Sequence, residues 1–414
     1  MGRRVIALPC ARVPRPRGAT SSLGMMNDGA VVAKMGGRAR LYEVALLFLR
    51  LGLTAFGGPA AHIAMMEDEV VRRRRWVSSE RFLDLMSAAS LIPGPSSSEL
   101  ALFLGCEQAG ALGLLVAGAC FIFPAAAMTT GIAWAYVRFG SLPHAASVLY
   151  GIKPVVIAIV FQAIWGLAPK ALKRSRWLAG LAAVACIASW AGVDALVVLV
   201  GTGLVSAVRH FPHARRGAGA TRWLALGSVA ATSAVASPAS VGLSGLFLTF
   251  VKVGAVVFGS GYVLLAFLRA DIVERLHWLS ESQLIDAVAV GQVTPGPVFT
   301  TATFIGYVLA GVPGAVVSTV AIFLPGFVFV AAARPVVARV RRFGLASAFL
   351  DGVNVASLAL MAVVTLHLAR AALIDPVTLA LALASAGLLV RFRLNSTWLI
   401  AAGALAGLAS RGLQ

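Results

Sequence analysis

The sequence has few charged residues for its length. Asp, Glu, Lys and Arg make up 12% of the 414 residues, which is about half of the share that is typical of soluble domains. Apolar residues make up 59%, and the mean hydropathy is +0.89. This composition excludes an ordinary soluble enzyme. Because a membrane-spanning helix needs roughly 20 apolar residues, it predicts an all-α polytopic membrane protein.

Acidic residues are especially scarce, since 16 Asp and Glu stand against 35 Lys and Arg, for a net charge of +19. An excess of this size is also found in nucleic-acid-binding proteins. Here, however, the basic residues lie in short clusters between apolar runs, as they do in the cytoplasmic loops of membrane proteins. We therefore expect no nucleic-acid partner. We expect a multi-pass protein of the bacterial inner (plasma) membrane, in contact with the lipid bilayer.

Motifs of catalysis and cofactor binding are missing from the sequence. The four cysteines are scattered without metal-ligand spacing, and neither a G-x-x-x-x-G-K-[ST] nor a G-x-S-x-G motif is present. We predict no metal, no cofactor, no disulfide and no enzymatic activity. An intramembrane enzyme and a non-transporting membrane scaffold are kept as alternatives. The sequence leaves open whether the chain forms a homodimer.

Residues 1–40 contain eight Lys and Arg residues between Pro and Gly residues. No apolar stretch of signal-peptide length follows them. We predict a disordered basic tail on the cytoplasmic side of the membrane. Met25, Met26 and Met35 are alternative start positions.

The chain contains an internal repeat. Phe56-Gly57-Gly58 recurs as Phe258-Gly259-Ser260, and Pro93-Gly94-Pro95 recurs as Pro295-Gly296-Pro297, both at a shift of 202 residues. After one deleted residue the shift becomes 201 and continues to Gly352. The predicted organisation is a tail at 1–40, a first repeat at 41–168, a linker with membrane helices at 169–242, a second repeat at 243–368 and C-terminal membrane helices at 369–414.

Charge distribution indicates that the two repeats have opposite orientations. The first repeat has Arg72–Arg75 in a loop whose counterpart in the second repeat has Arg275 among acidic residues. Further on the bias reverses, because one arginine, Arg138, corresponds to a cluster of four. Lys and Arg mark cytoplasmic loops, so equivalent loops face opposite sides. Inverted repeats are common in secondary transporters, whose substrate site lies between the repeats. A parallel duplication with an accidental charge bias is the alternative.

Breaks interrupt the apolar runs at Phe56–Pro59 and Pro93–Pro95, and both recur in the second repeat. Gly and Pro disfavour continuous helix, and unwound backbone at membrane depth is found only inside protein or beside a water-filled cavity. A re-entrant hairpin over residues 41–71 keeps the basic tail and Arg72–Arg75 on one side. A continuous crossing would place one of these clusters on the wrong side.

Each break creates a helix N-terminus, whose free amide groups and dipole bind anions. Hydroxyl groups follow both Pro-Gly-Pro motifs and can donate to an oxyanion, although such hydroxyls also bond to their own backbone. The substrate-binding residues that this reasoning predicts at the breaks are Gly57, Gly58, Pro59, Pro95, Ser96, Ser97, Gly259, Ser260, Pro297 and Thr300.

Two cations lie within apolar runs at equivalent positions, Arg50 and Lys252, each six residues before a break. A charge within the membrane is costly and marks a functional site by default, so we assign both to the anion site. Snorkelling toward the membrane surface is the alternative. Lys153 is an accessory cation, and His62 and Glu99 are the candidates for proton coupling.

The segment from Phe48 to His62, followed by Arg73–Trp76 and Pro93-Gly94-Pro95, resembles the chromate ion transporter family. The segment from Phe250 to Tyr262 and Thr294–Pro297 resembles the second domain of that family. The resemblance covers roughly residues 41–410. It implies a two-domain membrane transporter that exports chromate and confers chromate resistance, with sulfate as the related oxyanion. Our own hypothesis for the mechanism is alternating access around a site between the repeats, and transport of sulfate or molybdate is the alternative. Three residues depart from the family pattern, namely Ser90, Glu99 and Ser260.

Overall fold

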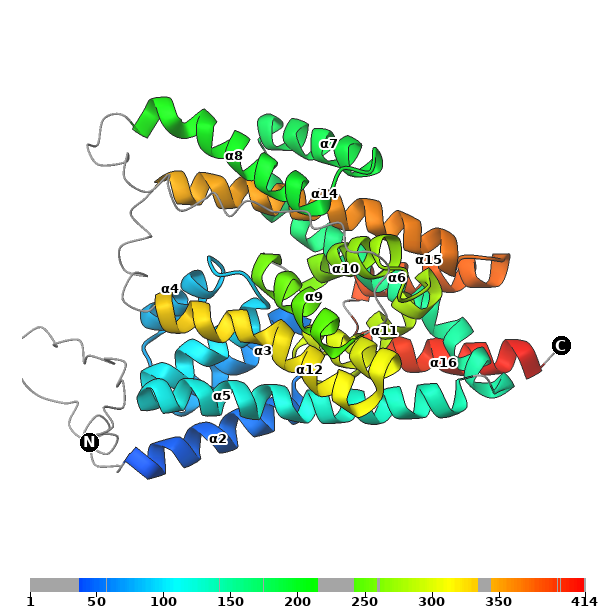
Figure 1. Cartoon of the computed structure of the whole chain (residues 1–414), viewed down its shortest axis with the longest axis horizontal. Coiled ribbons are helices and arrows are strands. Elements are labelled where there is room, and N and C mark those ends of the chain that lie inside the picture. Colours follow the sequence, from blue (N-terminus) through cyan, green and yellow to red (C-terminus); the bar gives the residue numbers. More distant parts are fainter. Residues whose placement is uncertain are drawn as a thin grey trace, which may run out of the picture.

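The computed structural model describes residues 37–56, 58–140, 142–173, 175–214, 242–258, 261–333, 344–392, 394 and 396–412, and within these ranges the chain forms helices and no strand. The first part of the chain contains α2 (Gly37–Thr54), α3 (Gly58–Glu67), the π-helical segment η1 (Asp68–Arg73), α4 (Ser79–Ala89), α5 (Ser96–Phe139), α6 (Pro143–Leu172), α7 (Arg176–Trp190) and α8 (Ala195–Ala214) (Figure 1).

The second part repeats this order of elements. It contains α9 (Leu243–Val256), the 3-10 turn η4 (Gly261–Val263), α10 (Leu264–Leu268), the π-helical segment η5 (Arg269–Arg275), α11 (Glu281–Val293), the 3-10 turn η6 (Val298–Thr300), α12 (Thr301–Ala333), α14 (Gly344–Ala372), α15 (Pro376–Phe392) and α16 (Ser396–Gly412). The prediction of an all-helical chain with two homologous halves is confirmed.

The longest helix in each half is folded back on itself. In α5 the backbone leaves helical geometry at Ala109 and Gly110, where Gly110 has φ +67°. In α12 the same happens at Ala310 and Gly311, with φ +63° at the glycine. L-residues with side chains rarely adopt a positive φ. Glycine at this position lets the chain reverse its direction sharply. The helix before each turn can then pack directly against the helix after it.

Glycine makes this close packing possible. A Cβ added to Gly105 would lie 2.3 Å from the backbone oxygen of Gly113, which belongs to the other arm of the turn. A Cβ on Gly306 would lie at the same distance from the oxygen of Gly314. The backbones of the two arms of each turn therefore come into direct contact at these glycines.

The first half begins with two helical hairpins. In the first, α2 runs inward and α3 with η1 runs back, so that Arg74 at the far end bonds Glu43 near the start of α2 at 3.1 Å. In the second, α4 runs inward and the first arm of α5 runs back, where Glu107 pairs with Arg81 at the start of α4. Each hairpin thus has both ends on one side and its tip in the interior. The prediction of broken or re-entrant helices is confirmed.

The halves run in opposite directions. In Figure 1 the second arm of α5 runs from left to right, and that of α12 from right to left. The two arms are in contact, since Gly118 of α5 lies against Phe327 of α12. The later helices exchange partners between halves: Gly151 of α6 packs on Gly403 of α16, and Gly352 of α14 packs on Thr202 of α8.

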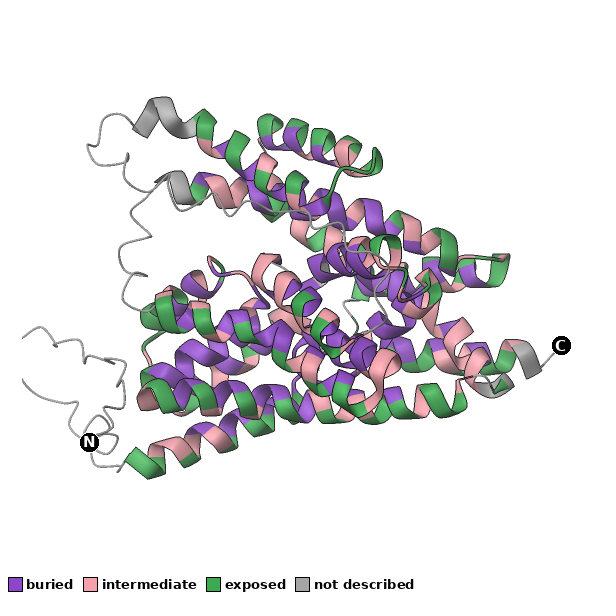
Figure 2. Ribbon diagram, viewed as in Figure 1, coloured by how far each residue is buried: buried purple, intermediate pink, exposed green. Residues whose placement is uncertain are grey.

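Buried residues form the centre of the molecule, while many large apolar side chains lie on its outside (Figure 2). Phe123 is 70% exposed and Trp398 is 76% exposed. Among the described residues, four helices are long and apolar enough to span a membrane, namely Ser96–Phe139, Ala145–Leu172, Val298–Ala333 and Ser347–Ala372. Apolar side chains on the outer surface suit a lipid environment, and the chain is a multi-pass membrane protein.

Candidate functional site

The tips of the hairpins of both halves meet at the centre of the molecule. The amide of Gly94, in the first Pro-Gly-Pro, donates to the carbonyl of Val257 after α9 at 2.6 Å. Reciprocally, the amide of Gly296, in the second Pro-Gly-Pro, donates to the carbonyl of Ala55 after α2 at 2.9 Å. Each Pro-Gly-Pro turn therefore lies on the helix break of the other half. We call this region the tip junction; its described residues are 55, 56, 58, 59, 93–99, 257, 258, 261 and 294–301.

Both central glycines are required by backbone geometry. Gly94 has φ +132° and Gly296 has φ +94°, and such angles are unfavourable for residues with a side chain. Gly58, which begins α3, has φ +78°. The glycines that the sequence places at the breaks thus let the backbone turn sharply within the protein.

Helix starts from both halves face one another at the tip junction. The first turns of α3 and α5 begin there with Pro59 and with Pro95 as the N-cap. A Cβ on Gly261, where η4 begins, would lie 3.9 Å from Cγ of Pro59. The positive ends of helix dipoles and the first-turn amides are thereby concentrated at one place, which favours an anion.

His62 links the two hairpin tips of the first half. Its Nε2 lies 2.9 Å from the carbonyl oxygen of Ala55, and its Nδ1 lies 3.4 Å from the hydroxyl of Ser97. A carbonyl can only accept, so this network assigns the proton to Nε2 and leaves Nδ1 to accept from Ser97. His62 is almost fully buried and also packs edge-on against Phe121. This arrangement positions the start of α5.

Ser98 and Glu99 bring unsatisfied polar atoms to the same place. Both residues are buried, and within the described part of the structure the Ser98 hydroxyl and the Glu99 Oε2 have no hydrogen-bond partner. The Glu99 carboxyl lies against two glycines, because a Cβ on Gly94 or on Gly326 of α12 would lie 2.0 Å or 2.9 Å from its Oε1. A buried polar group without a partner is unusual in a folded protein and calls for a functional explanation.

The second half presents its hydroxyls differently. Thr300 donates to the carbonyl of Pro297 at 2.9 Å, and Thr301 donates to that of Val298 at 2.8 Å. Such hydrogen bonds to the helix's own backbone are the alternative to donation to an oxyanion that the sequence left open. Thr294 lies 3.5 Å from Thr129 of α5, hydroxyl to hydroxyl. The two halves are thus equivalent in backbone but not in side-chain chemistry.

The structure brings Pro59, Pro95, Ser96, Ser97, Pro297 and Thr300 into the tip junction together with Gly58, His62 and Glu99. Three further predicted residues, Gly57, Gly259 and Ser260, lie outside the described residues.

Arg50 and Lys252 are each paired with a carboxylate of their own half. Arg50 lies 3.4 Å from Glu69 of η1, and its side chain is 59% exposed. Lys252 lies 2.9 Å from Asp271 of η5, and its side chain is 35% exposed. Glu69 and Asp271 are themselves equivalent at the shift of 202 residues, so the repeat contains the signal for these carboxylates, which sequence reasoning missed.

Lys153 belongs to a different cluster. Its ammonium group lies 3.4 Å from Oδ1 of Asp286 and donates to the hydroxyl of Ser282 at 2.5 Å. Tyr136 donates to the other oxygen of Asp286 at 3.0 Å. The cluster joins α5, α6 and α11, and its carboxylate is buried. Sequence reasoning singled out Lys153 but missed Asp286.

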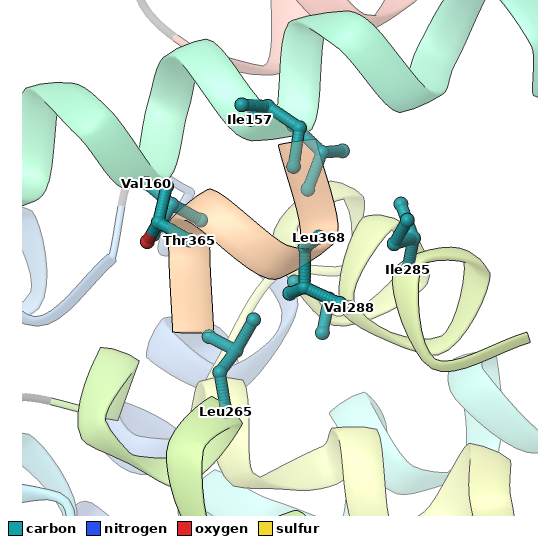
Figure 3. Close-up of a pocket in the computed structure, with 8 residues that line it drawn as sticks. Ile157, Val160, Leu265, Ile285, Val288, Thr365 and Leu368 are labelled. Carbon is teal, nitrogen blue, oxygen red and sulfur yellow. The ribbon is translucent and has the colours of Figure 1, made fainter. Parts of the chain in front are cut away.

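Two apolar spaces lie elsewhere. A small gap between α6, α10, α11 and α14 is lined by aliphatic side chains and by Thr365, whose hydroxyl bonds the carbonyl of Met361 (Figure 3). A groove of about 500 Å³ between α5 and α12 has apolar walls. The hydroxyls of its threonines, Thr130, Thr303 and Thr319, are hydrogen-bonded within the protein. Neither space offers free side-chain donors for an anion, whereas the tip junction has the buried hydroxyl of Ser98 and first-turn amides.

Comparison with known proteins identifies relatives over nearly the whole chain. A family model described as "Chromate transporter" matches residues 42–207 and 244–408, so that the first match ends within α8 and the second within α16. A chromate transport protein of Cupriavidus metallidurans is 34% identical over 380 residues, which are 89% of this chain and 92% of that protein. A chromate transport protein of Pseudomonas aeruginosa is 32% identical, over 87% of this chain and 90% of that protein. An uncharacterized transporter of Bacillus subtilis, YwrB, is 26% identical over 142 residues, which are 34% of this chain and 71% of that protein. No solved structure matches the chain.

Proposed function

The chain belongs to the chromate transporter family, and we propose that it is a secondary transporter that exports chromate from the cytoplasm and thereby confers chromate resistance. The named relatives are transport proteins, which points to transport rather than to an enzymatic reaction. The convergence of helix N-termini from both halves at the tip junction carries the proposal. It supports an oxyanion site between the repeats.

The first-turn amides and the hydroxyls at the tip junction are the donors for the oxyanion. Ser98 supplies a buried hydroxyl that has no other partner in the described structure, and Ser96 and Ser97 flank it in the first turn of α5. Thr300 offers a second hydroxyl from the opposite half when it releases its local bond to Pro297. Donors from opposite sides suit a tetrahedral anion better than one helix end does.

Arg50 and Lys252 attract the anion toward the tip junction. Each lies at the end of a helix that stops at a tip, and each is held by a carboxylate within its own half. An arriving dianion competes with Glu69 and Asp271 for these cations. Glu69 is also paired with Arg73 and Arg74, and Asp271 with Arg275. Exchange of ion-pair partners therefore lets the cations guide the anion without leaving these carboxylates unpaired.

The crossed arrangement of the two halves supports alternating access as the transport mechanism. The reciprocal backbone bonds of Gly94 and Gly296 join the halves at the tips, while the second arms of α5 and α12 run in opposite directions (Figure 1). Rocking of one half against the other opens the site to one side at a time, as in other inverted-repeat transporters.

The membrane potential favours export of a dianion. Moving one charge through 100 mV is worth about 2.3 kcal/mol, so a dianion leaving a negative cytosol gains roughly 4–5 kcal/mol. We place the protein in the bacterial inner membrane with its N-terminus in the cytoplasm. The basic residues 72–75 then lie on the same side as the start of α2, as the contact of Arg74 with Glu43 requires.

The proposal is tested by flux of radiolabelled chromate in proteoliposomes and in everted membrane vesicles. We expect chromate accumulation in everted vesicles that is driven by the membrane potential, and at least about a tenfold loss of it in Arg50→Ala and Lys252→Ala. Lys173→Ala is the matched control, because Lys173 is also paired with a carboxylate, Asp351, but lies at the end of α6. If both variants transport chromate at the wild-type rate, Arg50 and Lys252 take no part in chromate transport.

Sulfate and molybdate are the alternative substrates. Both are oxyanions of the same charge, and the donors at the tip junction do not by their chemistry distinguish them from chromate. Competition by each anion against chromate flux decides between them. If sulfate or molybdate is transported and chromate is not, chromate export is refuted and oxyanion transport is retained.

A further inference from the structure

Glu99 is a buried carboxyl group at the tip junction with no cation beside it. Its side chain is 1% exposed, and within the described structure its Oε2 has neither a hydrogen-bond nor an ion-pair partner. The carboxyl is held between Gly94 of its own half and Gly326 of the other half. It therefore lies at the interface that moves in an alternating-access transporter.

The other half has no such group. The second half has one residue fewer between its Pro-Gly-Pro and Gly306, so the equivalent of Glu99 is Thr300 or Thr301. Both threonine hydroxyls bond local backbone carbonyls, at 2.9 Å and 2.8 Å. The residue equivalent to Gly326 is Ala125, and its methyl group occupies the space above Gly296, 2.7 Å from where a Cβ of that glycine would lie. Beside Gly296 the methyl group of Ala125 thus fills the space that the Glu99 carboxyl fills beside Gly94.

The charged groups on the neighbouring elements are engaged elsewhere. Helix α12 has no acidic or basic residue between Thr301 and Ala333. On α3 the neutral ring of His62 is bonded to Ala55 and Ser97. The remaining groups on α2, α3, η1, α4, α9 and α11 are partnered or lie away from the tips: Arg38, Arg40, Glu43, Arg50, Glu67, Asp68, Glu69, Arg72, Arg73, Glu80, Arg81, Asp84, Lys252, Glu281 and Asp286.

The ionised form of a buried carboxyl without a cation is costly, and a second negative charge beside it raises that cost further. An oxyanion bound to the first turn of α5 adds negative charge next to it. We propose that Glu99 binds a proton whenever the oxyanion binds, so that one proton accompanies each anion through the transport cycle. The exported unit then carries one net negative charge, and the membrane potential drives its export with half the gain of the bare dianion. This inference rests on the proposed function, since it places the anion at the tip junction.

The coupling is reciprocal by thermodynamic necessity. If the anion strengthens proton binding, the proton strengthens anion binding by the same factor. Proton transfer is simple here: a proton from water on one side protonates Glu99, and the acid returns it to water on the other side. The apparent KM for the anion then rises with pH, by up to about tenfold per pH unit where Glu99 is ionised in the empty transporter.

The test is the pH dependence of chromate KM in proteoliposomes containing the full-length protein, from about pH 7.5 to about pH 9, where chromate remains a dianion. We expect the KM of the wild type to rise steeply over this range. In Glu99→Gln it is independent of pH, while transport driven by the membrane potential continues. Glu107→Gln is the matched control, because this second carboxylate of the same arm of α5 is paired with Arg81 and is expected to leave the pH dependence intact.

A second measurement does not depend on a variant. Chromate added to the purified wild-type protein in weakly buffered detergent solution is expected to take up about one proton per bound anion at alkaline pH, as reported by an indicator dye. The inference is overturned if no proton is taken up, or if Glu99→Gln keeps the pH dependence of the wild type. A wild-type protein that does not transport chromate refutes the proposed function instead.

Discussion

Substitution of Gly94 by Ala tests whether the Pro-Gly-Pro turn and the Glu99 carboxyl fit together as described. A Cβ at position 94 would lie 2.0 Å from Oε1 of Glu99 and 2.9 Å from its Cδ, and the backbone there has φ +132°. Two costs follow. An alanine held at such an angle costs about 1–3 kcal/mol, and the overlap with the carboxyl costs about another 1–3 kcal/mol, as overpacking of a core does.

The two costs are separated by removing the carboxyl. In a Glu99→Ala background the overlap is absent, so Gly94→Ala is expected to cost only the backbone strain. The double mutant is therefore more stable than the sum of the single mutants, by about 1–3 kcal/mol. Gly296→Ala is the matched control. It has the equivalent backbone strain, with φ +94°, but its Cβ meets the methyl group of Ala125. Removal of Glu99 is not expected to relieve it.

The measurement is thermal unfolding of the detergent-solubilised variants, followed by the fraction of protein that remains monodisperse after heating. We expect Gly94→Ala to lower the unfolding temperature. Adding Glu99→Ala is expected to restore most of the loss that comes from overlap between the new Cβ and the carboxyl. Effects of Gly94→Ala and Glu99→Ala that add within about 0.5 kcal/mol would refute the placement of the carboxyl against Gly94. If Glu99→Ala stabilised Gly296→Ala by the same amount, the rescue would not be specific to the contact between Gly94 and Glu99.

Three further outcomes are expected. Gly105→Ala destabilises the protein by about 1–3 kcal/mol, because its Cβ meets backbone atoms. Gly131→Ala in the same helix, with no atom within 4 Å, leaves stability unchanged or raises it by up to about 1 kcal/mol, as thermal unfolding measures. Lys153→Met costs up to about 3 kcal/mol by leaving the Asp286 carboxylate unpaired, and Asp286→Asn in the same chain restores part of it. The hydrogen bonds from the Thr378 amide and the Tyr150 hydroxyl lower the pKa of Asp375 at the start of α15. The wild type is therefore more stable than Asp375→Asn above about pH 4, and the difference shrinks as pH falls through the lowered pKa.

The breaks could be predicted because their cause is local. Gly and Pro interrupt a helix wherever they stand, and the repeat made the pattern visible twice. The same approach located the helix starts after Pro95 and Pro297. It did not predict the sharp turns at Gly110 and Gly311.

Contacts between distant segments could not be predicted. The bond from Gly94 to Val257 joins residues of opposite halves, and no local pattern encodes it. Glu69 and Asp271 reach Arg50 and Lys252 from π-helical segments, whose wider turn changes which side chains share a face. For the same reason the sequence treated the two cations as unpaired, whereas the structure gives each of them a carboxylate.

The exchange of late helices between the halves has a consequence for biosynthesis. Helix α6 ends at Leu172, but α16, which packs on it through Gly403, is complete only at Gly412. At a synthesis rate of 5–20 residues per second, the ribosome needs about 10–50 s to cover that interval. During this time the small-residue face of α6 is in contact with lipid or with the insertion machinery. The native pairing of α6 is therefore among the last to form, and variants at Gly151 or Gly403 are expected to reduce the yield of folded protein.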